Sequence, residues 1–251
     1  MSDTNHQKVQ SISSPDKSTL KAHNVRRIKN KNKPPCYLHT INKCRKQGEG
    51  CKNGEHIDGP FDINKWYKSG GILAYTYIDN DAQLLVGKEE GDEWTTFGGK
   101  REPCDETSID TCVREFCEES VAAYVPEDIS TENMTPKQQL VESIAYIKNI
   151  VNKQVAENPE KMIYIPSGKF HLLIIELPFV KVDKFDLMRK KNFNSEHKIT
   201  GTEKTEFDWI SARGFAKHFR TNRLANEWNG KTYTSFTKQL IMNANKFFKF
   251  I

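Results

Sequence analysis

The sequence predicts an α/β domain that follows a short cysteine-containing unit and a basic tail. Runs of β-branched, aromatic and leucine residues predict strands at 70–78, 82–90 and 170–180. Apolar residues at helical spacing predict amphipathic helices at 108–120 and 232–250. Strands interspersed with amphipathic helices are typical of a sheet covered by helices, which is the α/β class.

Length and composition allow one substantial domain with a small appendage. The chain has 251 residues, 36% of them hydrophobic and 28% charged, which is enough for a core and for solubility. It has neither a secretory signal nor a run of about 18 apolar residues. We therefore expect an intracellular, cytoplasmic protein that does not enter a membrane.

Charge is distributed unevenly along the chain. Residues 1–56 hold 12 Lys and Arg against 4 Asp and Glu, a net +8, whereas the remainder holds 26 against 29, a net −3. Residues 1–35 are also polar and lack apolar periodicity, which predicts a disordered tail. A basic arm of this kind favours polyanions such as RNA or anionic surfaces, or serves only as a solubilising tail.

Residues 36–58 carry a metal-ligand pattern. The spacing Cys-x7-Cys-x6-Cys-x4-His predicts a structural zinc site formed by Cys36, Cys44, Cys51 and His56. It resembles the CCCH zinc-finger family, many of whose members bind single-stranded RNA, although that family usually has three residues before the His. His39 is a competing ligand, and Tyr37 is the only aromatic residue available for base stacking.

The remaining domain, residues 66–251, divides into strands and helices along its length. Asp79-Asn80-Asp81 predicts the turn of a hairpin, and a further strand runs from Trp94 to Gly98-Gly99. Thr107 or Ser108 is expected to cap the first long helix, in which Cys112 and Cys117 pack as small apolar residues. Further along we expect a helix within 132–151, a loop or insertion at 181–200 and a strand at 203–211.

Three carboxylates share one face of the predicted helix 108–120. Glu115, Glu118 and Glu119 are spaced i, i+3 and i+4, so they lie within a single turn and repel one another. Mg²⁺ and Mn²⁺ prefer carboxylate oxygens and reverse that local charge balance. The cluster therefore predicts a metal site that receives a phosphate ligand; the alternative is a solvated acidic helix face.

Residues 98–121 resemble the signature of the Nudix hydrolase family, Gly-x5-Glu-x7-Arg-Glu-U-x-Glu-Glu-x-Gly-U, where U is apolar. The run Glu106-x7-Arg114-Glu115-Phe116-Cys117-Glu118-Glu119 matches without a gap, and Gly98-Gly99 precedes it. The chain departs from the signature in two places. Six residues rather than five separate Gly99 from Glu106, as in the diphosphoinositol polyphosphate branch, and Val121 replaces the late glycine.

The resemblance covers about residues 68–250 and implies an α/β/α sandwich with a mixed sheet and a metal-dependent pyrophosphohydrolase activity. By that resemblance Glu118, Glu119 and the Gly98 carbonyl would bind Mg²⁺ or Mn²⁺. Glu115 would bind the metal or orient the attacking water, and Arg114 would position the cluster through Glu106. A carboxylate outside the signature often completes such sites, and the candidates here are Glu203 and Glu206.

The basic arm and the zinc-finger pattern favour RNA as the partner, and hence removal of the 5′ cap. A small nucleoside diphosphate derivative or a diphosphoinositol polyphosphate is the alternative substrate, which Lys100, Arg101 and the basic 181–200 segment would suit. A third alternative, from another class, is an RNA-binding protein with an inactive Nudix fold, but such a protein would have lost its carboxylates. The oligomeric state has no signal in the sequence.

Overall fold

The computed structural model describes residues 62–165 and 168–248. The tail 1–35 and the cysteine unit 36–58 lie outside the described residues, so the zinc ligands predicted there stay predictions. None of the helices between residues 62 and 248 combines the length and apolar character needed to cross a bilayer.

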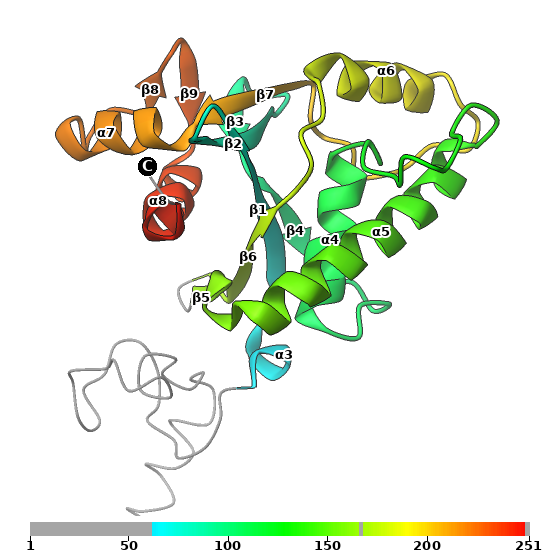
Figure 1. The fold of residues 1–251 in the computed structure, drawn as a ribbon, viewed down its shortest axis with the longest axis horizontal. Coiled ribbons are helices and arrows are strands. Elements are labelled where there is room, and N and C mark those ends of the chain that lie inside the picture. Colours follow the sequence, from blue (N-terminus) through cyan, green and yellow to red (C-terminus); the bar gives the residue numbers. More distant parts are fainter. Residues whose placement is uncertain (1–61, 166–167, 249–251) are drawn as a thin grey trace, which may run out of the picture. The chain divides into compact units, whose positions relative to one another are not determined.

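Nine strands of the described residues form one mixed sheet (Figure 1). Along the main path the order is β5 (Met162–Ile165), β6 (Phe170–Glu176), β1 (Ser69–Ile78), β2 (Asp81–Lys88), β3 (Glu93–Thr95), β9 (Lys231–Tyr233) and β8 (Glu227–Trp228). Off this path, β4 (Phe97–Lys100) pairs with β1 and β7 (Glu206–Ser211) pairs with β2.

The predicted hairpin is confirmed as β1 and β2. Asp79 and Asn80 occupy the turn with φ of 50° and 62°, a left-handed conformation that Asp and Asn tolerate better than other residues with a side chain. The register pairs Ile78 with Asp81 directly across this turn. Two residues with positive φ are what a tight hairpin turn requires, so the local sequence sets the register of the sheet centre.

Strand β1 is the centre of the sheet because it pairs with three strands. It runs parallel to β6 and antiparallel to both β2 and β4. Where β4 meets β1, a Cβ atom on Gly71 would lie 2.2 Å from the Phe97 carbonyl oxygen, and one on Gly98 would lie 2.6 Å from the Gly70 carbonyl oxygen. Only glycine fits at this close approach, which explains the glycine pairs in both strands.

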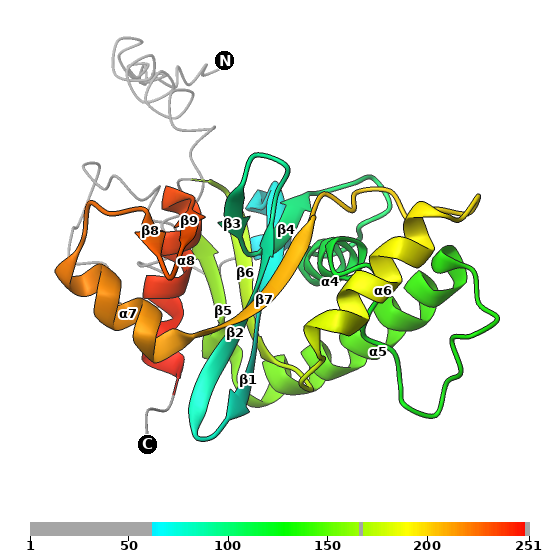
Figure 2. The same cartoon turned by 90° about the horizontal axis from the view of Figure 1, so that it is seen from above.

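Helices cover both faces of the sheet (Figure 2). One layer contains α4 (Ser108–Glu119), α5 (Pro136–Glu157) and α6 (Val182–Phe193), and the other contains α7 (Ala212–Thr221) and α8 (Ser235–Ala244). Three short elements complete the described set: α3 (Ile63–Trp66), η1 (Pro159–Lys161) and η2 (Asn245–Phe247). The predicted α/β/α sandwich with a mixed sheet is confirmed.

Each layer has its own apolar core against the sheet. Phe116 of α4 and Phe185 of α6 lie in one core with Phe207 of β7, whose ring is stacked on Phe185 at a centroid distance of 4.8 Å. Phe215 of α7 and Leu240 of α8 lie in the other core. The apolar positions that predicted the strands therefore alternate between two cores, as expected for a sheet buried on both faces.

Three parts of the chain differ from the expectation. The segment 181–200 is not a loop, because Val182–Phe193 forms α6, which buries Phe185, Met188 and Asn192 at spacings of three and four residues. Helix α7 and the short β8–β9 hairpin were not expected from the sequence. The C-terminal helix is shorter than 232–250: Lys231–Tyr233 is strand β9, and α8 spans Ser235–Ala244.

His171 of β6 is a titratable group buried in the sheet. It is 0% exposed, and neither ring nitrogen has a hydrogen-bond partner among the described residues. Burial lowers the pKa of His171 to about 3, because the low-dielectric interior disfavours the charged imidazolium. The imidazole therefore stays neutral in the folded protein at any pH above this value.

His171→Leu should flatten the pH dependence of stability on the acid side. In the unfolded chain His171 has its ordinary pKa of 6.5 and binds a proton below that pH, whereas in the folded protein it stays neutral. The free energy of unfolding therefore falls as the pH drops below 6.5. Between pH 7 and pH 5 this loss amounts to about 2 kcal/mol. Urea unfolding of both proteins at the two pH values measures the difference, and an unchanged slope in the variant would contradict it.

Candidate active site

The acidic face belongs to α4, whose first turn is fixed by a capping box. The Thr107 hydroxyl accepts a hydrogen bond from the Asp110 amide at 3.2 Å, and the Asp110 carboxylate accepts one from the Thr107 amide at 2.8 Å. Cys112, Phe116 and Cys117 are all 0% exposed on the core side of the helix. Burial raises the pKa of Cys117 to about 12, so this thiol is protonated and packs as an apolar group.

Helix α4 ends at Glu119 without a glycine. Val121 and Ala122 have φ of 51° and 52°, a left-handed conformation that is uncommon for a β-branched residue such as valine. Both side chains are buried, and Val121 belongs to the core under α4. Apolar burial therefore offsets the backbone strain at the position where the signature has glycine.

Arg114 is the hub of the acidic face. Its Nε donates to Asp105 Oδ1 at 3.0 Å and its Nη2 to Asp105 Oδ2 at 2.9 Å, a bidentate pair. The same guanidinium contacts Glu115 Oε1 at 3.0 Å and Glu118 Oε2 at 2.9 Å. Its Nη2 also donates to the Lys100 carbonyl at 2.8 Å, which attaches the end of β4 to the helix.

The expected pairing of Arg114 with Glu106 is wrong. Among the described residues Asp105 takes that place, and it is buried with its side chain only 3% exposed. Glu106 is exposed and helps line a cavity of about 340 Å³ next to Arg114. Five residues separate Gly99 from Asp105, which is the number that the signature places between its glycine and its first glutamate. Compared with the signature, the one additional residue of this chain therefore lies between Asp105 and α4.

Hydrogen bonds keep Asp105 ionised despite its burial. Burial alone would raise its pKa, but donors from Arg114, the Glu102 amide and the Thr111 hydroxyl outweigh that effect and lower it. The donor atoms of Glu102 and Thr111 both lie 2.8 Å from Asp105 Oδ2. Asp105 therefore fixes the orientation of Arg114, which in turn orients two of the glutamates.

Backbone passes close to two of the glutamate carboxylates. A Cβ atom on Gly99 would lie 2.3 Å from Glu115 Oε2, so a residue larger than glycine would push this carboxylate away. A Cβ atom on Gly201 would lie 3.5 Å from Glu118 Oε2. Strand β4 and the segment that follows α6 thus border the acidic face.

Glu119 is the most deeply buried of the three glutamates, at 4% exposure. Its Oε2 accepts a hydrogen bond from the Gly98 amide at 2.6 Å, and its Oε1 lies 3.2 Å from the Lys204 ammonium. Burial raises the pKa of Glu119 to about 7, although Lys204 and the Gly98 amide act in the opposite direction. The carboxylate is therefore destabilised as an anion even with these two partners.

Lys204 is 2% exposed and is the residue that the sequence interpretation missed most completely. Its ammonium lies 2.9 Å from Glu89 Oε1, just after β2, and also donates to the Thr95 hydroxyl. Its stem passes over Gly87, where a Cβ atom would lie 2.8 Å from the lysine side chain. Lys204 thus joins the β2–β3 hairpin to Glu119, while nothing in its local sequence marks it as buried.

Together the cluster holds more negative charge than it neutralises. Arg114 pairs with Asp105, Glu115 and Glu118, whereas Lys204 pairs with Glu89 and Glu119, so five carboxylates lie within 3.2 Å of two cations. Glu102 is a sixth, more distant partner at 3.9 Å from Arg114. Burial raises the pKa of Glu115 and of Glu118 as well as that of Glu119. A divalent cation would relieve this excess, and carboxylate oxygens are the donors that Mg²⁺ and Mn²⁺ prefer.

The present arrangement is not a preassembled metal site. Between residues 62 and 248, no three His, Cys, Asp or Glu side chains converge as they would around a metal ion. The glutamate oxygens contact Arg114, Lys204 and the Gly98 amide instead. The donor types fit a divalent metal, and binding would require these side chains to exchange partners.

The other predicted residues lie around this cluster rather than in it. Glu206 pairs with Lys88 at 2.8 Å on the surface, and Glu203 is exposed. Lys100 is exposed at the end of β4, and the Arg101 guanidinium lies 4.7 Å from the centre of the Tyr67 ring. The carboxylate outside the signature that does join the cluster is Glu89, through Lys204.

No known family model matches the chain. An uncharacterized protein of Acanthamoeba polyphaga mimivirus, L534, is 34% identical over 88 residues, which are 32% of this chain and 29% of that protein. The chain therefore matches less than a third of this relative's length.

Solved structures of Nudix proteins give low-scoring matches. The Ap4A hydrolase of Caenorhabditis elegans in a binary complex is 11% identical, with 72% of this chain and 97% of that chain covered and a TM-score of 0.33. A NUDIX hydrolase from Alicyclobacillus acidocaldarius is 13% identical, with 71% and 90% covered and a TM-score of 0.37. The NUDIX domain of Shewanella oneidensis NrtR with ADP ribose is 13% identical, with 73% and 88% covered and a TM-score of 0.36.

Asp105→Asn should destabilise the protein far more than Glu106→Gln. The first change removes the buried charge that partners Arg114 and should lower the free energy of unfolding by about 3 kcal/mol. The second alters an exposed side chain and should change it by less than about 0.5 kcal/mol. Urea unfolding at pH 7 measures both, and equal effects would show that Asp105 does not anchor the arginine.

Proposed function

We propose that this protein is a metal-dependent hydrolase that cleaves a pyrophosphate linkage. The observation that carries the proposal is the cluster of five carboxylates within 3.2 Å of two cations, with three of the carboxylates on one turn of α4 beside Gly98 and Gly99 of β4. A solvated acidic helix face would not need a half-buried arginine that binds three carboxylates or a buried lysine. The spacing Arg114-Glu115-x2-Glu118-Glu119 supports the same reaction through its resemblance to the Nudix signature.

The residues of the chain have distinct roles in this proposal. Glu118, Glu119 and the Gly98 carbonyl would hold Mg²⁺ or Mn²⁺, and Glu115 would bind the metal or orient the attacking water. When bound, the metal neutralises phosphate oxygens and makes water a stronger nucleophile near neutral pH. Arg114 keeps Glu115 and Glu118 in place through Asp105, and Lys204 keeps part of the charge on Glu119 neutralised. No covalent enzyme intermediate is required.

The substrate that we favour is the 5′ cap of RNA. The net +8 of residues 1–56 and the Cys-x7-Cys-x6-Cys-x4-His pattern support an RNA-tethering unit in the same chain as a pyrophosphate-cleaving site. Small nucleoside diphosphate derivatives and diphosphoinositol polyphosphates are the second candidate, supported by the exposed Lys100 near the acidic face. Retention of all three glutamates speaks against an inactive, purely RNA-binding role.

Hydrolysis assays with Mn²⁺ on capped RNA, nucleoside diphosphates, dinucleoside polyphosphates and diphosphoinositols test the reaction and its substrate together. Release of methylated guanosine diphosphate from capped RNA alone is the result expected for decapping.

Glu118→Gln and Glu119→Gln should each lower turnover by roughly 10² or more, the effect of losing one electrostatic contact to the transition state. Glu157→Gln, an exposed change on α5, is the matched control. Near-normal turnover of the first two variants would refute the metal assignment.

Zinc binding by residues 36–56 is a separate prediction. Native mass spectrometry of the full chain should find one zinc ion, and joint replacement of Cys36, Cys44 and Cys51 by serine should abolish it. Cys104→Ser, which alters an exposed cysteine outside this unit, should leave the zinc in place. A wild-type protein without zinc, or a triple variant that keeps it, would contradict the ligand assignment.

A further inference from the structure

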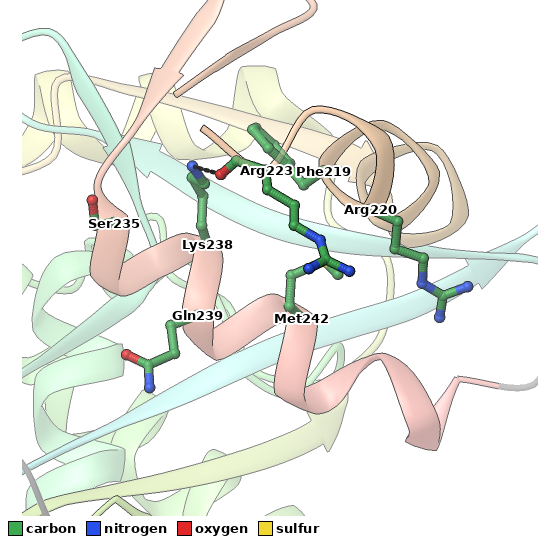
Figure 3. A pocket seen from close by; sticks show the side chains of 7 residues that line it. All are labelled: Phe219, Arg220, Arg223, Ser235, Lys238, Gln239 and Met242. Atoms are coloured by element: carbon green, nitrogen blue, oxygen red, sulfur yellow. Dashed lines mark hydrogen bonds between the residues drawn. The ribbon is translucent and has the colours of Figure 1, made fainter. Parts of the chain in front are cut away.

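A second candidate site lies between α7 and α8, in the layer on the other side of the sheet from the glutamates (Figures 1 and 3). A cavity of about 530 Å³ opens there. It is lined by Phe219, Arg220, Arg223, Ser235, Lys238, Gln239 and Met242. Three of these residues are cationic and none is acidic, so the cavity is suited to an anion.

Charge along the described chain is segregated between the two layers. Residues 212–248 hold 7 Lys and Arg against 1 Asp or Glu, a net +6, whereas residues 62–211 hold 18 against 27, a net −9. Among the described residues, no ion pair involves Arg220 or Arg223, and both are exposed. The fold therefore does not use these two guanidinium groups for its own charge balance.

The cavity wall is held in place by Lys238. Its ammonium donates to the Ala225 carbonyl, to Asn226 Oδ1 at 3.0 Å and to the Arg223 carbonyl at 3.5 Å. It also lies 4.9 Å from the centre of the Phe219 ring. Figure 3 shows the Arg223 side chain running from this anchored loop toward Met242, with Arg220 beside it at the end of α7. The backbone that carries the two arginines is thus held by a restrained loop and by the end of α7. This limits the backbone entropy that is lost when the arginines bind a ligand.

The chemistry around the cavity suits phosphate groups that carry bases. Guanidinium groups bind phosphate oxygens through paired hydrogen bonds, and Ser235 places the positive end of the α8 dipole at the rim. The exposed Gln239 amide and the half-buried Met242 offer hydrogen bonds and an apolar contact for a base. Exposed Arg213 and Lys217 lie on α7, the same helix as Arg220, and add positive charge that a polymer can use.

We propose that the cavity between α7 and α8 binds the phosphate backbone of single-stranded RNA. This deepens the proposed function by giving the RNA substrate a binding surface in the folded domain, away from the glutamates. An anionic membrane is the other polyanion to consider, because Leu224 at the loop tip is 98% exposed. A concave surface with polar Gln239 and Ser235 and a single exposed leucine favours RNA over a lipid surface.

Fluorescence anisotropy of the full chain with a labelled RNA of roughly 12 nucleotides tests the proposal. EDTA in the buffer prevents metal-dependent hydrolysis, so the assay measures binding alone. The double variant Arg220→Ala with Arg223→Ala should bind about tenfold more weakly at about 0.1 M salt. Losing two phosphate contacts should also reduce the slope of log affinity against log salt by roughly 1.4.

The matched control is Lys137→Ala with Lys153→Ala, which removes the same charge from exposed positions of α5 in the opposite layer. The basic N-terminal residues are present in every protein, so their contribution cancels in the comparison. Arg220→Lys with Arg223→Lys should retain most of the affinity, and urea unfolding verifies that each variant is folded. Equal affinities of the arginine variant and its control would overturn the proposal.

Photo-crosslinking with 4-thiouridine RNA provides an independent readout of location. Adducts on peptides that cover residues 219–242 are expected, and adducts confined to residues 1–61 would overturn the proposal. Flotation with phosphatidylserine vesicles tests the other polyanion: if the arginine variant loses vesicle binding but keeps RNA binding, the site belongs to a membrane. RNA binding without hydrolysis would refute the proposed function alone, whereas hydrolysis without an arginine effect would refute only this inference.

Discussion

The structure depends on one buried ionic contact, in which the Glu119 carboxylate lies between the Gly98 amide and the Lys204 ammonium. The contact fastens the end of α4 to β4 and to the segment before β7, in addition to the contacts that Arg114 makes with Lys100 and Phe116 with Phe97. Removing charges from water is unfavourable unless partners are close, so the three groups must stay together for the fold to persist. Burial at this contact raises the pKa of Glu119 to about 7, so the carboxylate is partly neutral near physiological pH. A purely structural ion pair does not require a pKa near 7.

Much of the fold follows from local sequence, and the exceptions have physical causes. The β1–β2 hairpin and α4 are specified by short-range signals, namely the Asp79-Asn80 turn and the Thr107 cap. Helix α6 lacks such signals, because Lys181 provides no side-chain cap and only three of its residues are buried. Its position is set by packing against β7, a contact between distant parts of the chain that periodicity cannot reveal.

The site was predictable as far as its residues lie on one helix. Helical spacing alone brings Glu115, Glu118 and Glu119 to one face. Asp105 and Glu106 are adjacent carboxylates, and the choice between them depends on how the loop accommodates one extra residue, which spacing does not decide. Lys204 is 85 positions away from its partner Glu119, and a lysine within the polar run Thr202–Glu206 normally indicates exposure.

The parallel pairing of β1 with β6 has a consequence for synthesis of the chain. Ser69 pairs with Phe170 and Tyr75 with Glu176, so the centre of the sheet joins segments about 100 positions apart. At translation rates of about 5–20 residues per second, β6 is synthesised roughly 5–20 s after β1. During that interval the apolar sides of β1 and α4 have no sheet partner on the β6 side. We therefore expect the nascent chain to need chaperone protection until the second half of the domain has emerged.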